Sequence, residues 1–271
     1  MSNNLTFDAY INNPGGKGSS FIPNKELIRQ TFTQQWDDLR LRENGLIMYH
    51  LYTDAKDFYI HFKIPSGLID KFYYDVVIRF YPKDNTQSME KSLSNYLVQF
   101  YSNDPNFVFT FCYAYKSNGL FIKDLESKMS RLALKQPAKI KNPRNEVGYV
   151  KTIYYAYLEM KRNDLFQKGR WENRASKYSK SVWNTTIAHA DDKIKDTQEL
   201  QAAKRKEDKK LKAREKNSNT EFERNASNNI KNGFDSPNKK NFGHFKAPTP
   251  NKLGVITKTI SKGFGRFKKS N

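Results

Sequence analysis

Few residues of this 271-residue chain combine the types and the spacing that a chemical reaction would require. The four histidines are scattered along the chain as His50, His61, His189 and His244, and no cysteine or acidic residue stands near them at a metal-ligand spacing. His50 and His61 fall on neighbouring predicted strands, and we interpret them as polar strand residues. Cys112 lies among aromatic residues, where a thiol is more often a packing group than a nucleophile. We therefore predict no metal site and no cysteine nucleophile.

Two Glu-x-Lys tripeptides match a pattern of metal-dependent nucleases, in which one strand points an acid and a lysine at the metal. They are Glu126-Ser127-Lys128 and Glu159-Met160-Lys161. Both fall in predicted helices, where residues i and i+2 diverge, so we interpret them as solvated helix charges. The run NNPGGKG at 12–18 lacks the P-loop spacing and the Ser or Thr after its lysine. We predict that the protein is not an enzyme and carries no cofactor.

The positive charge lies in one half of the chain. The 48 Lys+Arg and 28 Asp+Glu give a formal charge of +20. Residues 1–130 hold 14 of each sign and 24 of the 38 aromatic residues, so residues 131–271 carry the whole excess. This division predicts a packed front half and a basic back half that meets an acidic partner. No apolar run of about 18 residues occurs, so we expect no membrane partner.

Hydrophobic periodicity predicts an α+β core domain at residues 21–162, preceded by a flexible arm at 1–20. Apolar residues at helical spacing predict helices at 25–43, at 87–101, near 120–131 and at 146–162. Alternation with period two predicts half-buried strands at 46–53, 58–64, 72–81 and 107–115. These elements favour an antiparallel sheet of about four strands packed by two or more helices. We expect one buried cluster comprising Phe62, Val76, Ile78, Phe80, Leu93, Leu97, Phe109 and Phe111.

The back half is predicted to extend away from this core. Residues 135–145, KQPAKIKNPRN, indicate an extended basic connection. A basic helical extension is expected at 163–216, with Trp171 and Trp183 in an exposed docking segment and a charged helix from 189. Residues 217–271 have too few apolar residues to offset the entropy of ordering, so we predict a disordered basic tail.

Phenylalanines in the tail are interleaved with lysine, arginine and glycine. This pattern suits stacking on single-stranded nucleic acid, a solvated linker, or a peptide arm that inserts phenylalanines into pockets of a neighbouring subunit. The wide spacing of the phenylalanines favours the arm. With the two tryptophans, the candidate partner-binding residues are therefore Phe242, Phe245, Phe264, Arg266, Phe267, Lys268 and Lys269.

A family resemblance adds to this interpretation. The runs LVQFYSNDPNFVFTFCYAY (97–115), NGLFIKDL (118–125) and KNPRNEVGYVKTIYYAYLEM (141–160) resemble segments of virion structural proteins from tailed phages of low-GC bacteria. The predicted order of helix, three strands, helix and strand is also similar to that of tail-terminator and tail-completion proteins, which form rings where the tail meets the neck.

The resemblance implies a non-enzymatic ring subunit at the neck or tail-completion position, made in the bacterial host cytoplasm and incorporated into the virion. Its expected partners are further copies of itself, other virion proteins and DNA that passes close to the basic segments. The alternative is a nucleic-acid-binding accessory protein that uses the basic aromatic C-terminal tail.

Overall fold

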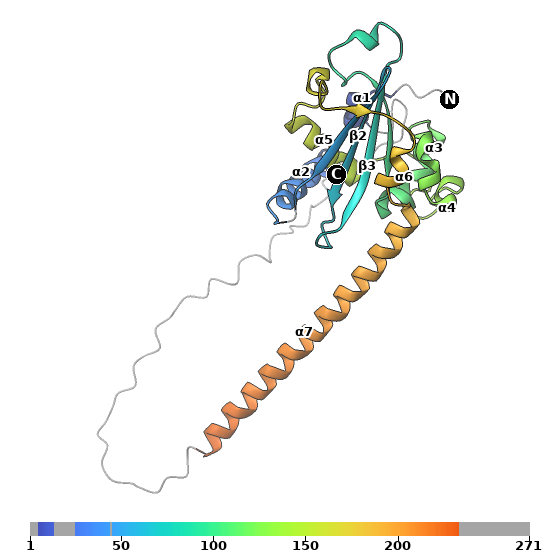
Figure 1. The fold of residues 1–271 in the computed structure, drawn as a ribbon. Coiled ribbons are helices and arrows are strands. Elements are labelled where there is room, and N and C mark those ends of the chain that lie inside the picture. Colours follow the sequence, from blue (N-terminus) through green and yellow to red (C-terminus); the bar gives the residue numbers. More distant parts are fainter. Residues whose placement is uncertain (1–4, 14–24, 44, 233–271) are drawn as a thin grey trace, which may run out of the picture. The chain divides into compact units, whose positions relative to one another are not determined.

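The computed structural model describes residues 5–13, 25–43 and 45–232 and has an α+β fold (Figure 1). Its sheet has the strand order β4-β3-β2-β1-β5, in which β1 and β5 are parallel and all other neighbours are antiparallel. The strands are β1 (Met48–Asp54), β2 (Asp57–Pro65), β3 (Tyr73–Tyr81), β4 (Leu97–Ser102) and β5 (Ser176–Lys177). The fold class and the three strands predicted between residues 46 and 81 are confirmed.

Helices and helical turns account for much of the remaining described chain. They are α1 (Phe7–Asn12), α2 (Lys25–Arg40), η1 (Gln87–Met89), η2 (Phe107–Phe111), α3 (Cys112–Ser117), η3 (Lys123–Lys128), α4 (Arg131–Lys135), α5 (Lys151–Arg162), η4 (Lys168–Arg170), α6 (Val182–Thr186) and α7 (Ala190–Asn232). The chain divides into two compact units, Met1–Ala213 and Arg214–Asn271. None of the helices in the described ranges is both long and apolar enough to cross a membrane.

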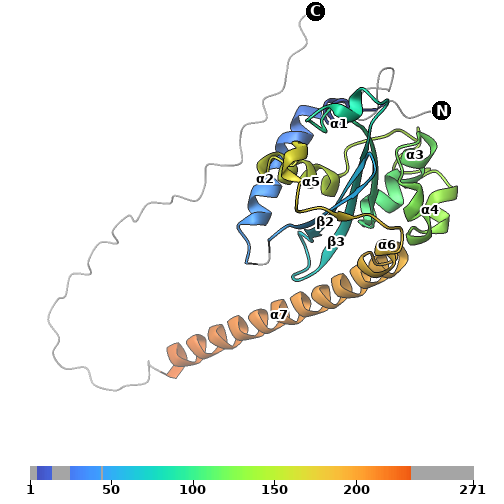
Figure 2. The ribbon, with the colours of Figure 1, turned by 45° about the horizontal axis from the view of Figure 1, so that its top comes forward.

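One face of the sheet is covered by α1, α2 and α5 (Figure 2). The predicted helices at 25–43 and 146–162 correspond to α2 and α5. The expectation of a flexible arm at 1–20 is wrong for α1, because Phe7, Tyr10 and Ile11 are buried. Their spacing of three and four residues places them on one helical face, and the hydroxyl of Thr6 caps the helix by accepting from the amide of Ala9.

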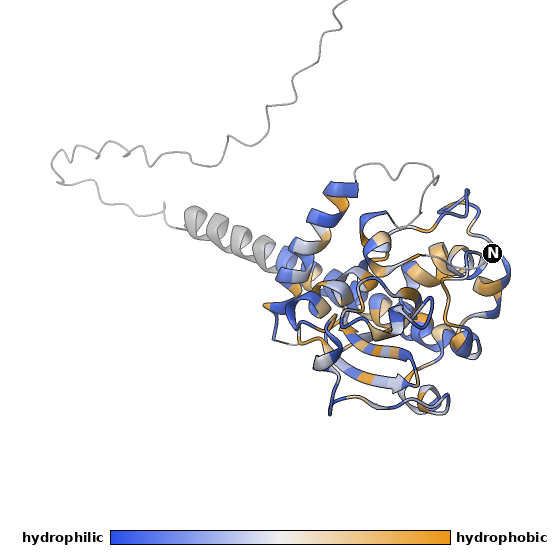
Figure 3. Ribbon diagram, turned by 90° about the horizontal axis from the view of Figure 1, so that it is seen from above, coloured by the Kyte–Doolittle hydropathy of each residue, from blue (hydrophilic) through white to orange (hydrophobic). Residues whose placement is uncertain are grey.

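The second face of the sheet is also covered, which the alternation alone did not predict. Figure 3 shows apolar and polar residues alternating along the strands. In β2, Ile60 and Phe62 point toward the helices, whereas Tyr59 and His61 point to the other face, yet all four are buried. Segments from residues 120–134 and 176–187 pack over this second face. The strands are therefore buried on both sides rather than on one.

The predicted helix at 87–101 is wrong. Only the short turn η1 is helical there, and residues 97–102 form β4, which pairs with β3 from Val76↔Ser102 to Tyr81↔Leu97. The apolar residues Leu93, Leu97 and Phe100 happen to have helical spacing. Pairing with β3 satisfies the backbone of β4 and buries both of its faces, so tertiary contacts override the local pattern.

The predicted strand at 107–115 is also wrong, because these residues form the π-helical turn η2 followed by α3. Asp104-Pro105 starts this helical segment. The amide of Val108 donates to the Asp104 carbonyl at 3.0 Å. Proline is well tolerated in the first turn of a helix, where its missing N–H leaves no bond unmade. Phe107 is buried as a result, but Phe109 is 49% exposed.

The predicted core is mostly confirmed, and its errors follow from the strand wrongly predicted at 107–115. Phe62, Val76, Ile78, Phe80, Leu93 and Leu97 are buried. Phe111 is only partly buried, and Phe109 lies outside the core. In the back half, α7 confirms the charged helix predicted from 189, but it continues through residues 217–232, where a disordered tail was predicted.

Candidate functional site

Trp171 and Trp183, predicted to be exposed, are 2% and 1% exposed. They belong to residues 171–187, which we call the strap. The strap passes from one face of the sheet to the other around its edge, where β5 pairs with β1. Trp171 packs edge-on against Phe58 at 5.5 Å, on the face that carries the helices. Trp183 packs against Tyr52 at 5.4 Å, on the opposite face.

This position corrects the expectation of an exposed docking segment. The strap covers the free edge of β1, which would otherwise present unpaired backbone groups. The indole of Trp171 donates to the carbonyl of Leu165 at 2.8 Å, and that of Trp183 donates to the Tyr178 hydroxyl at 3.1 Å. Residues 163–187 are thus part of the compact unit, which runs to Ala213 instead of ending at 162.

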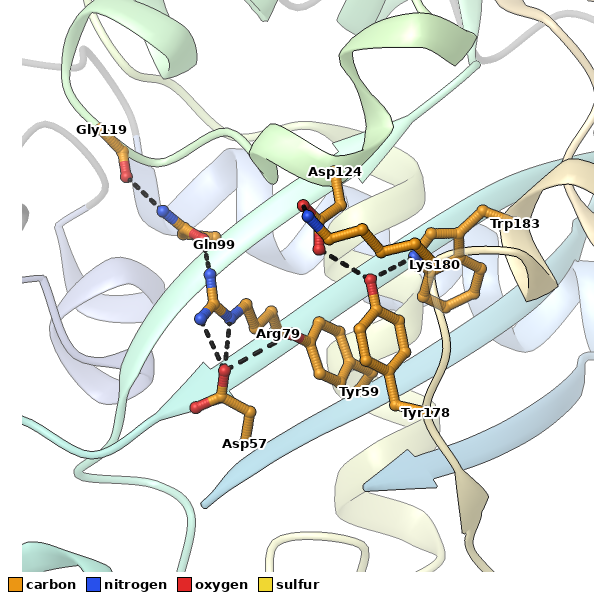
Figure 4. Close-up of polar contacts among 9 residues, drawn as sticks. All are labelled: Asp57, Tyr59, Arg79, Gln99, Gly119, Asp124, Tyr178, Lys180 and Trp183. Atoms are coloured by element: carbon orange, nitrogen blue, oxygen red, sulfur yellow. Dashed lines mark hydrogen bonds and ion pairs between the residues drawn. The ribbon is translucent and has the colours of Figure 1, made fainter. Parts of the chain in front are cut away.

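A polar and aromatic network fastens the strap to the sheet (Figure 4). Tyr178 stacks on Tyr59 of β2 with ring centroids 4.1 Å apart, and its hydroxyl donates to Asp124 at 2.8 Å. Lys180 forms an ion pair with the same carboxylate at 2.9 Å. Burial raises the pKa of the Tyr178 phenol, so this group stays protonated and donates.

Arg79 of β3 completes the network on the side away from the strap. Its Nε donates to Asp57 at 3.0 Å and its Nη1 to Gln99 at 2.9 Å, while its guanidinium lies over Tyr59 at 5.7 Å. Each of these side chains therefore already has a partner within the protein. The network joins β2, β3, β4 and the strap, and we interpret it as a structural tie rather than as a reaction centre.

A second buried cluster surrounds Asp75, whose side chain is 0% exposed. Its carboxylate accepts from His61 at 2.8 Å, from Lys63 at 2.6 Å and from Asn103 at 2.8 Å. Lys63 also donates to the carbonyl of Thr186 in the strap at 3.0 Å. Burial alone would raise the pKa of Asp75, but the hydrogen bonds from His61 and Lys63 and the positive charge of Lys63 outweigh it, so the pKa lies below its usual value.

His61 is neutral in this cluster, because burial lowers its pKa more than Asp75 raises it. Its Nε2–H donates to Asp75, and its Nδ1 is buried with no hydrogen-bond partner in the described chain. Protonation would place an unsatisfied N–H donor at Nδ1, which is unfavourable in a buried position. His50 lies directly opposite His61 in the register but is exposed.

We expect the free energy of unfolding to fall as the pH is lowered from 7 to 5. Below its ordinary pKa of about 6.5, His61 takes up a proton in the unfolded chain but not in the folded protein. One such group contributes at most about 1.4 kcal/mol per pH unit. Urea unfolding at pH 5, 6 and 7 measures the slope. His61→Gln, which keeps a donor for Asp75, should flatten it, whereas His50→Gln should not; equal slopes in all three proteins would exclude His61 as the cause.

The other sequence candidates lie apart from one another. The expectation of a solvated helix charge is wrong for Glu159, which is buried in α5 and accepts from Asn163 at 2.8 Å, because its side chain lies on the packed face of the helix. Lys161 is exposed, so the two residues diverge as expected for a helix. Cys112 is buried at the start of α3, and burial raises the pKa of its thiol to about 12. Within the described ranges, no three His, Cys, Asp or Glu side chains gather closely enough to hold a metal ion.

A groove of about 830 Å³ lies between α2, α5 and the first turns of α7. Its buried carboxyl, Asp104, accepts from the hydroxyl of Thr152 at 2.9 Å and from the amide of Asn106 at 2.8 Å. Exposed Phe109 stands at its rim. The carboxyl of Asp104 therefore holds η2 and α5 together.

Comparisons of this chain with protein-family models, with curated proteins and with solved structures find no match. The tail candidates Phe242, Phe245, Phe264, Arg266, Phe267, Lys268 and Lys269 lie outside the described residues. Two surfaces of the described residues are basic, and the candidate partner-binding residues named from the sequence lie in neither of them.

The first basic surface is on α7. Ala190, Ile194 and Thr197 are buried against the rest of the first unit, but the side chains of residues 202–213 are all exposed. Residues 204–213, which we call the basic turns of α7, contain six Lys/Arg and two acidic residues. They have no continuous apolar face, so these turns are not stabilised by packing against a hydrophobic core.

The second basic surface is residues 131–144, which we call the basic loop. It begins with α4 and contains Arg131, Lys135, Lys139, Lys141 and Arg144, all exposed. Among the described residues, none of these five cations forms an ion pair. Instead of the extended connection predicted at 135–145, the chain turns back, and the amide of Asn142 donates to the carbonyl of Ala138 at 2.9 Å.

Proposed function

We propose that this protein is a non-enzymatic structural protein of a phage virion, a ring subunit at the neck or tail-completion position. Its body supplies a rigid α+β unit, and α7 with the chain beyond it contacts neighbouring subunits. The family resemblance supports the virion setting. The observation that carries the assembly role is the exposed basic surface of α7.

The basic turns of α7 carry six cations against two acidic residues, so several cations lie next to one another on the helix. Arg205 and Lys209, and likewise Lys206 and Lys210, are like charges four residues apart, which destabilise a helix by a few tenths of a kcal/mol per pair. Opposite charges also pair at helical spacing, since Asp208 lies four residues from Lys204 and from Lys212, and Glu207 lies three residues from Lys204 and from Lys210. The excess of four cations remains, so an acidic surface on a neighbouring protein is the complementary partner, and this is the partner we assign to α7.

The expected result for the full chain is a defined oligomer without nucleic acid, measured by size-exclusion chromatography with light scattering. A chain ending at Ala202 keeps the buried contacts of Ala190, Ile194 and Thr197, so its body should unfold at a similar temperature. It should nevertheless fail to assemble. A chain ending at Asn232 retains α7 and lacks the tail candidates, so it separates the contribution of the helix from that of the tail.

The triple variant Lys206→Glu, Lys209→Glu and Lys210→Glu tests the charge of α7 without shortening the chain. These side chains are exposed, so the fold should be unaffected. We expect weaker assembly that high salt no longer modulates. A full chain that stays monomeric at all concentrations, and whose DNA affinity disappears when residues 217–271 are removed, would instead support the nucleic-acid-binding accessory protein.

A further inference from the structure

The basic loop differs from the basic turns of α7 because no acidic residue interrupts its cations along the sequence. Residues 127–145 contain six Lys/Arg and not one Asp or Glu. In the basic turns of α7, by contrast, Glu207 and Asp208 interrupt the cations. An uninterrupted set of unpaired cations suits a partner with regularly repeated negative charge, such as a phosphate backbone.

Several bonds hold the basic loop in one conformation. Asn142, which is buried, donates its side-chain amide to the carbonyls of Thr110 at 3.1 Å and Glu146 at 2.8 Å, and its Oδ1 accepts from the amide of Glu146 at 3.0 Å. The hydroxyl of Tyr115 donates to the carbonyl of Gly148 at 2.8 Å. A cationic surface that is already ordered loses little backbone entropy when it binds.

The chain that follows the basic loop also packs closely against η2, which further fixes the conformation of the loop. A Cβ on Gly148 would lie 2.6 Å from the ring of Phe111, so glycine allows the chain after the basic loop to pack directly on η2. The helix α4 packs beside α3, and both views show them together (Figures 1 and 2). On α4, Arg131 and Lys135 are four residues apart and share one side of the helix.

We propose that the basic loop binds the phosphate backbone of double-stranded DNA without reading its sequence. Lysine is depleted at protein–protein interfaces, where aromatic residues are enriched, yet three of the five cations are lysines and residues 127–145 contain no aromatic residue. Single-stranded nucleic acid is commonly held by stacking on aromatic side chains, which this surface lacks. A rigid cationic surface therefore fits a duplex better than it fits an acidic protein or a single strand.

The test uses the full chain, a fluorescently labelled duplex of random sequence, and anisotropy measured between 50 and 200 mM salt. The variant Lys139→Glu, Lys141→Glu and Arg144→Glu changes only exposed side chains. The α7 variant with Lys206, Lys209 and Lys210 changed to Glu is the matched control, because both variants lower the formal charge from +20 to +14. Since this control is also expected to weaken assembly, all proteins are compared at concentrations below the one at which the wild type assembles.

We expect the basic-loop variant to bind the duplex about 100-fold more weakly at 50 mM salt, and the α7 control less than about fivefold more weakly. The slope of log affinity against log salt should become shallower by about 2.7 in the loop variant, which is 3 × 0.9 for three lost phosphate contacts. Assembly of the loop variant should remain intact, so this inference and the proposed assembly role can fail separately.

Three outcomes would overturn the inference. Equal losses in both variants would mean that the net charge, and not this surface, attracts DNA. Unchanged duplex affinity in the loop variant, with lost binding to a polyglutamate peptide, would assign the surface to an acidic protein. Tighter binding to a single strand or to duplex RNA than to duplex DNA would assign it to another nucleic acid.

Discussion

Phe107→Ala is expected to lower the free energy of unfolding by about 3–5 kcal/mol, the usual cost of truncating a buried phenylalanine. Phe107 is 0% exposed and packs edge-on against Tyr115 at 5.1 Å, inside the helical segment that replaces the predicted strand. Truncation removes this contact and leaves a cavity beneath η2. Urea unfolding of the variant beside the wild type measures the loss.

Phe109→Ala is the matched control, two residues along the same segment. Because Phe109 is 49% exposed, its truncation should cost less than about 1 kcal/mol. A strand at 107–115 would place both phenylalanines on one face and make the two variants similar. Equal and large losses would therefore contradict the helical assignment, whereas a large difference between them supports it.

Trp183→Ala is expected to cost about 3–5 kcal/mol and to loosen the strap. Trp183 is 1% exposed and packs against Tyr52, Tyr59 and His61 on the second face of the sheet. Its loss also removes the N–H that donates to the Tyr178 hydroxyl. Besides a lower midpoint of unfolding, we expect faster amide hydrogen exchange across residues 176–187, since these residues lose their main apolar anchor.

Lys180→Ala provides the control in the same strap. Lys180 is largely exposed and contributes only the ion pair with Asp124, so its loss should cost less than about 1 kcal/mol. If the Trp183→Ala variant is as stable as Lys180→Ala, Trp183 is not buried, and the exposed docking segment predicted from the sequence is the better description. That result would also remove the argument that the strap covers the sheet.

The hydrophobic pattern of a segment was sufficient to predict its secondary structure and its buried face where that pattern fits only one kind of element. The strands β1, β2 and β3 alternate clearly, and their phase correctly placed Phe62, Val76 and Phe80 in the core. The helix α2 and the charged helix α7 also followed from apolar spacing and composition. In these segments, propensity and burial agree, so the sequence and the tertiary structure lead to the same element.

Local pattern was insufficient where short apolar runs suit two kinds of element. In 97–115, apolar residues fit a helix followed by a strand, but the structure has β4 followed by η2 and α3. The edge of β3 decides the first choice, because it offers backbone partners to residues 97–102. Asp104-Pro105 then begins the helical segment, because an aspartate followed by a proline is a common start of a helix.

For the candidate binding surfaces too, the sequence determined one part and the tertiary structure determined another. The sequence by itself determined that the charge of +20 lies in the back half and that residues 127–145 lack acidic residues. Only the tertiary structure decided which back-half residues are available to a partner: Trp171 and Trp183 are buried, while the five cations of the basic loop and the basic turns of α7 are exposed. Periodicity reports neighbours a few residues away, whereas Trp183 is buried by strands more than 100 residues earlier in the chain, and no local pattern contains that contact.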